Sequence, residues 1–148
     1  MDFSLTPEQK ELQSVARAFA QKEMTSVAKE LEKKKEFLPD EWFDRYAEMG
    51  FLGINISKKY GGLGLPNLDA LLVLEEFAKV SSVVAWPIFE SAVGPIKAIE
   101  HFANEDLKQR IIPEVCKGNL FVAVSMSEPH AGSALTDLTT KAEKKDDH

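Results

Sequence analysis

Residues 120–133 read Leu-Phe-Val-Ala-Val-Ser-Met-Ser-Glu-Pro-His-Ala-Gly-Ser, and the chain changes character within this stretch. Its first half, residues 120–126, is short, apolar and rich in side chains that favour extended backbone, which is typical of a buried strand. Its second half, residues 127–133, collects small, polar and turn-forming residues. The stretch therefore predicts a strand that ends in a loop.

The sequence after this loop favours a second strand. Residues 137–143 alternate loosely, with Leu138 and Thr140 on one face, and residues 144–148 have the composition of a polar turn. Two strands alone are marginally stable, so we expect the chain to be cut inside a β domain. Residues 119–148 are assigned to the start of that incomplete domain.

The sequence before this stretch is helical in pattern. Thr6, Pro7 and Gln9 form the signature of a helix start with a capping box. Apolar residues then recur at helical spacing, and further helices are predicted over 39–49, 68–80, 81–102 and 104–118. The helix over 68–80 is apolar on nearly every side and is expected to be buried on more than one face. The fold class is therefore mainly all-α, with a helical bundle over residues 1–118.

A glycine-rich segment, residues 60–67, lies between two predicted helices. Gly61, Gly62 and Gly64 could cradle a phosphate, but the strand and spacing of a dinucleotide fingerprint or a P-loop are lacking. A structural turn is the favoured interpretation.

The composition and net charge of the chain argue against several classes of function. The chain has 148 residues and a net charge of -6, which argues against nonspecific nucleic-acid binding. It has one cysteine, and no cluster of His, Cys or carboxylates has the spacing of a metal site. Its amino terminus lacks the pattern of a signal peptide, and no apolar run is long enough to cross a membrane. We expect a cytoplasmic protein without metal, membrane or nucleic-acid contacts.

Several landmarks occur together in a consistent order. They are Phe3–Gln9, Met49–Gly53, Tyr60–Gly64, Glu75-Glu76, Asn104–Lys108 and Ser127–Ser133. In this order they resemble the acyl-CoA dehydrogenase family, which typically reads Thr-Glu-Pro-Gly-Ala-Gly-Ser-Asp at the last landmark. The resemblance covers the whole chain.

The resemblance implies a flavoenzyme of fatty acid metabolism with an α domain, a β domain and a carboxy-terminal helical domain. FAD would accept a hydride from the β carbon of an acyl-CoA thioester, after a carboxylate of the last domain removes the α proton. No catalytic residue is therefore expected in this chain, which we expect to be inactive alone. An electron-transfer flavoprotein as electron acceptor and a homo-oligomer are also implied.

Five residues are candidate cofactor contacts by their positions in the motif: Val124, Met126, Ser127, Gly132 and Ser133. Val124 and Met126 could present a flat apolar surface to a flavin ring, and Ser127 offers a hydroxyl at the strand end. Gly132 permits close approach of a ligand, and Ser133 adds a donor that could also contact acyl-CoA. The alternative interpretation is a Pro-Gly turn that connects two strands.

Two residues depart from the family motif. His130 stands where glycine is usual, and Ala134 where aspartate is usual. These departures leave two alternatives open: a non-catalytic dehydrogenase-like subunit, and a flavin oxidase or monooxygenase of the same fold.

Overall fold

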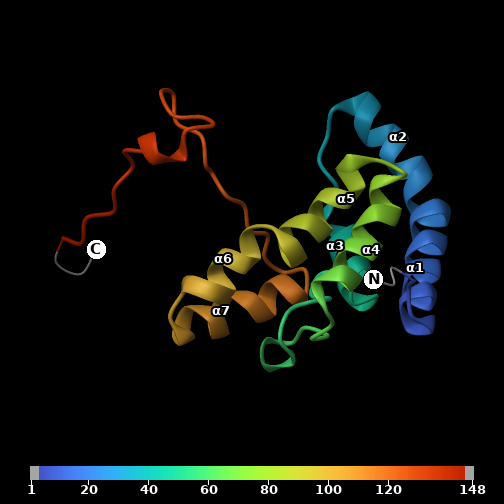
Figure 1. The fold of residues 1–148 in the computed structure, drawn as a ribbon. Coiled ribbons are helices and arrows are strands. Elements are labelled where there is room, and N and C mark those ends of the chain that lie inside the picture. Colours follow the sequence, from blue (N-terminus) through green and yellow to red (C-terminus); the bar gives the residue numbers. More distant parts are fainter. Residues whose placement is uncertain (1–3, 146–148) are drawn as a thin grey trace.

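A computed structural model describes residues 4–145, and these residues form a helical body followed by an extended tail (Figure 1). The landmark residue Phe3 and the last part of the predicted polar turn lie outside the described range. The α-helices are α1 Pro7–Phe19, α2 Thr25–Lys34, α3 Asp40–Glu48, α4 Asn67–Ala78, α5 Ser82–Ile88, α6 Pro95–Phe102 and α7 Glu105–Cys116. The predicted all-α class is confirmed.

Local signals decide where the helices begin and end. The Thr6 side chain accepts a hydrogen bond from the Gln9 amide at 3.2 Å, and the Gln9 side chain accepts one from the Thr6 amide at 3.1 Å. Asn104 caps α7 in the same way, since its side chain accepts from the Leu107 amide at 2.9 Å. Gly50, which follows α3, has a φ of 74°, a left-handed conformation that glycine adopts without strain. The predicted helix starts and stops are confirmed at these positions.

The larger core lies where α1, α3, α4 and α5 meet. Phe77 of α4 is fully buried, and its ring centroid lies 5.1 Å from that of Tyr46, 5.2 Å from that of Phe51 and 5.8 Å from that of Phe19. The buried Tyr46 hydroxyl donates to the Val84 carbonyl at 2.9 Å, so the hydrogen-bonding capacity of this buried donor is satisfied.

A second, smaller core joins α6 and α7 to the glycine-rich segment, and α6 and α7 lie side by side in Figure 1. Gly61 and Gly64 have φ values of 89° and 66°. The amide of Gly64 donates to the carbonyl of Ile56 at 2.8 Å, and that of Leu63 donates to Gly53 at 2.9 Å. The segment is therefore a turn held by backbone hydrogen bonds to residues 53–56, and the structural turn that the sequence favoured is confirmed.

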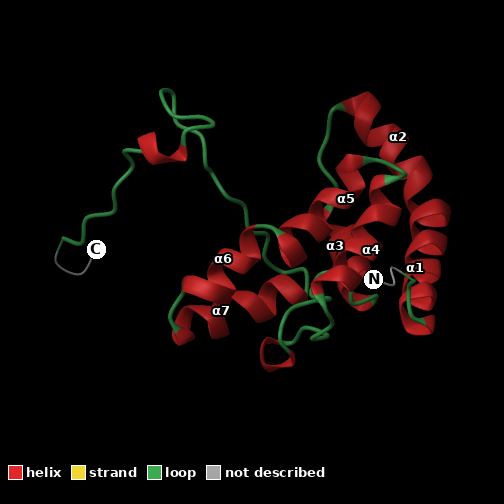
Figure 2. Ribbon diagram, viewed as in Figure 1, coloured by secondary structure: helices red, strands yellow, loops and turns green. Residues whose placement is uncertain are grey.

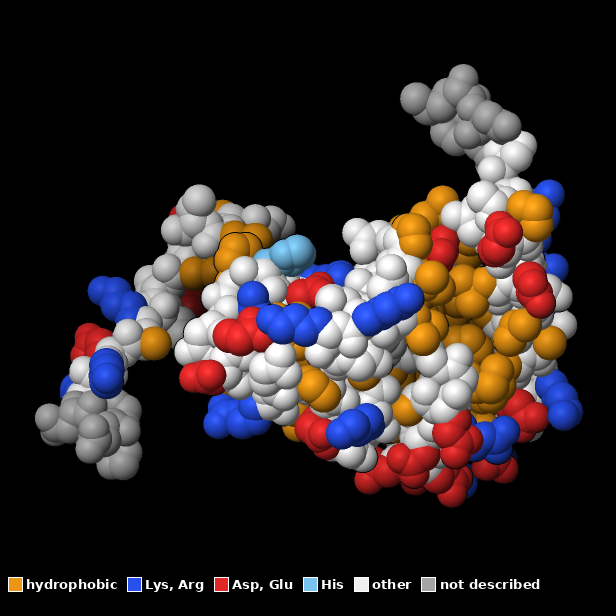
Figure 3. All heavy atoms as spheres, turned by 90° about the horizontal axis from the view of Figure 1, so that it is seen from below, with side chains coloured by type: hydrophobic (Ala, Val, Ile, Leu, Met, Phe, Trp, Pro, Cys, Tyr) orange, Lys and Arg blue, Asp and Glu red, His pale blue; other side chains and the backbone are white. Residues whose placement is uncertain are grey.

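The prediction that α4 is buried on more than one face is only partly right. Ala70, Val73 and Phe77 are buried, but Leu68 and Leu71 are 49% and 48% exposed. Figure 3 shows apolar side chains gathered over a broad area of the helical body rather than scattered across it. Helical spacing places Leu68 and Leu71 on one side of α4, away from the core that its other side faces.

The two predicted strands are not formed, and this is a correction. Among the described residues no strand occurs, and residues 120–127 and 138–145 are loops (Figure 2). Residues Leu135–Asp137 form a short 3-10 helix, and the single β-bridge joins Glu128 to Ala131. A strand is stabilised by hydrogen bonds to a neighbouring strand, and within residues 4–145 neither segment has such a neighbour.

Two helical turns with π geometry were not anticipated. Ala20–Met24 joins α1 to α2, and Phe89–Val93 follows α5. Pro87 stands inside α5, just before the second turn, and the Ser91 hydroxyl of that turn donates to the Pro87 carbonyl at 2.7 Å. A π turn shifts the helical register by about one residue, which apolar periodicity does not reveal.

Candidate functional site

The five predicted contact residues all lie on the tail that leaves α7, which Figure 1 shows extending away from the helical body. Val124 and Met126 are 53% and 54% exposed, and Ser127, Gly132 and Ser133 are exposed as well. The structure gathers the last three into one loop and leaves the first two on the extended stretch before it. These residues thus offer an accessible surface with apolar and polar parts.

Glu128 organises this loop, and sequence reasoning missed it. One carboxylate oxygen accepts hydrogen bonds from the amide and hydroxyl of Thr139, at 2.9 and 3.1 Å. The other accepts from the Thr140 amide at 2.8 Å and from the Thr140 hydroxyl. The backbones of Glu128 and Ala131 also exchange hydrogen bonds of 2.9 and 3.1 Å. We call this arrangement, formed by Glu128, Ala131, Thr139 and Thr140, the Glu128 clasp.

The hydrogen bonds of the clasp predict how the stability of the closed loop depends on pH. The side-chain bond from Thr140, with the backbone bonds from Thr139 and Thr140, lowers the pKa of Glu128 to about 2. A lowered pKa stabilises the closed loop above the ordinary glutamate value of about 4.3, and that contribution is lost as pH falls from there through 2. We expect the amide signals of Thr139 and Thr140 in NMR spectra to change with a midpoint near pH 2. In an E128Q variant this transition should be absent, and a wild-type midpoint above pH 4 would contradict the clasp.

Within the described residues 4–145, neither the backbone nor the packing requires a glycine at position 132. Its φ lies outside the left-handed region, and a Cβ atom placed there would meet nothing within 4 Å. A glycine that neither the backbone nor the packing requires fits a position where a ligand approaches the backbone closely. The contact role of Gly132 stays a prediction.

An apolar groove lies beside the start of the tail. Its volume is about 680 Å³, and the residues that line it include Phe37, Phe43, Val83, Trp86 and Phe121. Phe121 connects the groove to the tail, because its ring packs edge-on against that of Phe43 with 5.7 Å between centroids. Phe121 is the residue of the tail that lines the groove, and Val124 and Met126 follow it in the chain without lining it.

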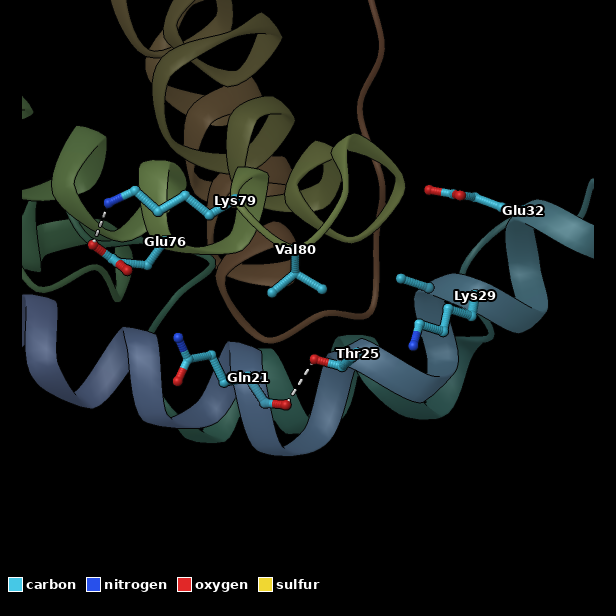
Figure 4. A pocket seen from close by; sticks show the side chains of 8 residues that line it. Gln21, Thr25, Lys29, Glu32, Glu76, Lys79 and Val80 are labelled. Carbon is cyan, nitrogen blue, oxygen red and sulfur yellow. Dashed lines mark hydrogen bonds and ion pairs between the residues drawn. The ribbon is translucent and has the colours of Figure 1, made fainter.

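A second hollow, of about 440 Å³, lies where α4 faces the junction of α1 and α2 (Figure 4). Two of the charged side chains that line it, Glu76 and Lys79, are paired with each other. The Arg17 guanidinium donates two hydrogen bonds of 3.0 Å to the buried Glu76 carboxylate, and Lys79 lies 2.8 Å from it. The bonds from Arg17 are the largest cause that lowers the pKa of Glu76, and burial opposes them. The cluster of Arg17, Glu76 and Lys79 fastens α1 to α4.

Other classes of site find no support in the part of the chain that the structure describes. Residues 4–145 contain no group of three His, Cys, Asp or Glu side chains placed to hold a metal ion. No described helix is both long and apolar enough to cross a membrane.

Comparison with known proteins gives relatives along nearly the whole chain. It is 35% identical over 145 residues to mitochondrial isovaleryl-CoA dehydrogenase of Bos taurus, which covers 97% of this chain and 34% of the relative. It is 34% identical to 3-sulfinopropanoyl-CoA desulfinase of Advenella mimigardefordensis, over 99% of this chain and 36% of that protein. The chain thus spans about a third of the length of these relatives.

Solved structures agree with the sequence relatives. Butyryl-CoA dehydrogenase from Megasphaera elsdenii matches with a TM-score of 0.87 and 29% identity, over 99% of this chain and 39% of that one. A chain from work on the electron transferring flavoprotein of Acidaminococcus fermentans matches with a TM-score of 0.90 and 30% identity, over 99% and 38%. The family model for the acyl-CoA dehydrogenase N-terminal domain matches residues 6–119. The chain therefore belongs to the acyl-CoA dehydrogenase family.

Proposed function

We propose that the protein carrying this chain is an FAD-dependent acyl-CoA dehydrogenase that desaturates an acyl-CoA thioester between its α and β carbons. The observation that carries the proposal is the exposed loop of Ser127, Gly132 and Ser133, in which no described residue fills the space beside the α-carbon of Gly132. Residues 119–148 are, in this proposal, the start of the β domain. The relatives' names, which include two acyl-CoA substrates, support the substrate class.

The proposal assigns this chain a binding role. FAD, when bound, supplies the hydride acceptor. Val124 and Met126 are proposed to cover its ring, while Ser127, Gly132 and Ser133 contribute polar contacts, with Ser133 also touching acyl-CoA. The apolar groove beside Phe121 offers a surface suited to a hydrocarbon acyl group.

The base is proposed to lie outside the described residues. Glu128 is the carboxylate nearest in sequence to the contact residues, but its oxygens accept bonds from Thr139 and Thr140 and its pKa is about 2. A carboxylate with so low a pKa is a weak proton acceptor at neutral pH. An electron-transfer flavoprotein is the proposed electron acceptor, and a homo-oligomer the proposed assembly.

Two titrations test the proposal. The 148-residue chain alone is expected to bind FAD with a Kd of about 1 mM or weaker, because the exposed loop offers only one side of a site. The full-length product of the gene should bind FAD, and its flavin absorbance should bleach when the correct acyl-CoA is added without oxygen.

The results of the two titrations distinguish the proposed dehydrogenase from the alternative functions. Tight stoichiometric FAD binding by the chain alone would contradict the expectation of an incomplete site. A full-length product that binds no flavin would favour the non-catalytic subunit instead. Flavin that is reduced only by compounds other than acyl-CoA thioesters would favour the oxidase or monooxygenase.

A further inference from the structure

His130 occupies the corner of a tight turn closed by the bridge from Glu128 to Ala131. Its Nε2 atom lies 3.3 Å from a carboxylate oxygen of Glu128 and 3.2 Å from the hydroxyl oxygen of Thr139. Both groups belong to the Glu128 clasp. The imidazole is therefore held by one nitrogen against the loop that the clasp closes.

The other ring nitrogen of His130, Nδ1, faces different surroundings. Within residues 4–145, Nδ1 of His130 has no hydrogen-bond partner, although the Nε2 side is engaged, and 55% of the side chain is exposed. A carboxylate that engages one ring nitrogen orients the ring and determines which nitrogen is presented to a ligand. His130 is thus an oriented, accessible imidazole with one nitrogen open to solvent.

Its neighbours are the residues proposed to contact the ligand. Gly132 and Ser133 follow directly after the bridge, and the α-carbons of His130 and Gly132 can lie at most roughly 7 Å apart. Gly132 leaves open space at its α-carbon, and Ser133 is exposed with a hydroxyl. An imidazole, a hydroxyl and an unshielded backbone are groups that together suit a phosphate oxygen.

The charge balance of the loop is compatible with an anion. Glu128 is the acidic side chain closest to the imidazole, and its two oxygens already accept four hydrogen bonds from Thr139 and Thr140. The negative charge of Glu128 is thus stabilised by the amide and hydroxyl hydrogens of Thr139 and Thr140. Within residues 127–134 Glu128 is the only acidic residue, since Ala134 stands where the family pattern has aspartate.

We propose that His130 is a further ligand-contact residue. In its imidazolium form Nε2–H donates to the Glu128 carboxylate, and Nδ1–H donates to a phosphate oxygen of the diphosphate group that FAD and acyl-CoA both carry. Glu128 is its positioning residue. The proposal rests on the proposed function, because it places this ligand at the loop of Gly132 and Ser133. It also accounts for a histidine at a position where the family pattern has glycine.

The test is an NMR titration of the isotope-labelled 148-residue chain with CoA and, separately, with FAD. The ring signals of His130 and the amide signals of Gly132 and Ser133 are followed. Pantetheine and riboflavin serve as probes that lack the diphosphate. We expect the His130 ring signals to shift with CoA, FAD or both, and to stay in place with pantetheine and riboflavin. A shift with CoA alone assigns the phosphate to the substrate, and a shift with FAD alone assigns it to the cofactor.

At a fixed ligand concentration below the Kd, the shifts of the Gly132 and Ser133 amides should be about tenfold smaller in H130N, the typical effect of losing a charge-assisted hydrogen bond. The matched control is H101N, since His101 is an exposed histidine on α6, and its affinity should equal that of the wild type. E128Q should weaken binding in the same direction as H130N. Both His130 and Glu128 lie on the tail, so loss of the bundle does not confound the comparison.

Two results overturn the inference in distinguishable ways. If the Gly132 and Ser133 amides shift while the His130 ring does not, and H130N binds as the wild type does, the contact is absent but the proposed function stands. If no loop signal responds to either ligand at millimolar concentration, the inference fails, and flavin reduction in the full-length protein decides the proposed function separately.

Discussion

Replacing Phe77 by alanine is expected to lower the free energy of unfolding by about 3–5 kcal/mol. Phe77 is fully buried and its ring meets those of Phe19, Tyr46 and Phe51 at centroid distances between 5.1 and 5.8 Å. Truncation removes apolar area from the core and leaves a cavity among rings that come from three different segments. Because small domains are typically stable by about 5–15 kcal/mol, the loss would take away a large part of the total.

Urea unfolding followed by circular dichroism measures this effect. The matched control is F37A, which makes the same chemical change at a residue that is 95% exposed. The control should change the free energy of unfolding by less than about 0.5 kcal/mol. If F77A and F37A unfold at the same urea concentration, the aromatic cluster is not the centre of the core.

Replacing Gly62 by alanine is expected to destabilise the chain by about 3 kcal/mol. A Cβ atom at this position would lie 2.2 Å from the Ile56 carbonyl oxygen and 2.6 Å from its carbonyl carbon, which are backbone atoms. The same carbonyl accepts the hydrogen bond from Gly64 that closes the turn. The turn would have to open, and Ile56, which is part of the smaller core, would move with it.

The control for this prediction is G132A, because a Cβ atom there would meet nothing within 4 Å. Thermal unfolding should show a lower Tm for G62A and an unchanged Tm for G132A. The reverse order would mean that the turn over residues 60–67 tolerates side chains and that the loop of the candidate site does not. Equal Tm values would show that the close approach of Gly62 to Ile56 is not required for the fold.

The candidate site was predictable in part. The residue types of the loop 127–133 pointed to a ligand contact, and the structure gathers Ser127, Gly132 and Ser133 there. The role of Glu128 was not predictable, because its partners Thr139 and Thr140 are 11 and 12 residues away. Nothing in the spacing of these residues indicates that the chain returns to this carboxylate. The contact roles of Val124, Met126, Ser127, Gly132 and Ser133 stay predictions.

The predicted strands show the limit of local patterns. Residues 120–126 carry the composition of a buried strand, but they form an unpaired loop. Composition reports how well side chains fit a sheet, whereas a strand exists only when a neighbour supplies its hydrogen bonds. The prediction of two strands was wrong because it was made from the composition of each segment alone, whereas a strand forms only when a second segment pairs with it.

The sequence by itself determined the helical class and the starts and stops of helices at Thr6, Gly50 and Asn104. These depend on contacts within three or four residues, which the order of residues specifies directly. Only the tertiary structure decided that Arg17 pairs with Glu76, that Leu68 and Leu71 stay exposed, and that Glu128 closes the loop around His130. These depend on which distant segments meet in space, and that is decided by the packing of the whole chain.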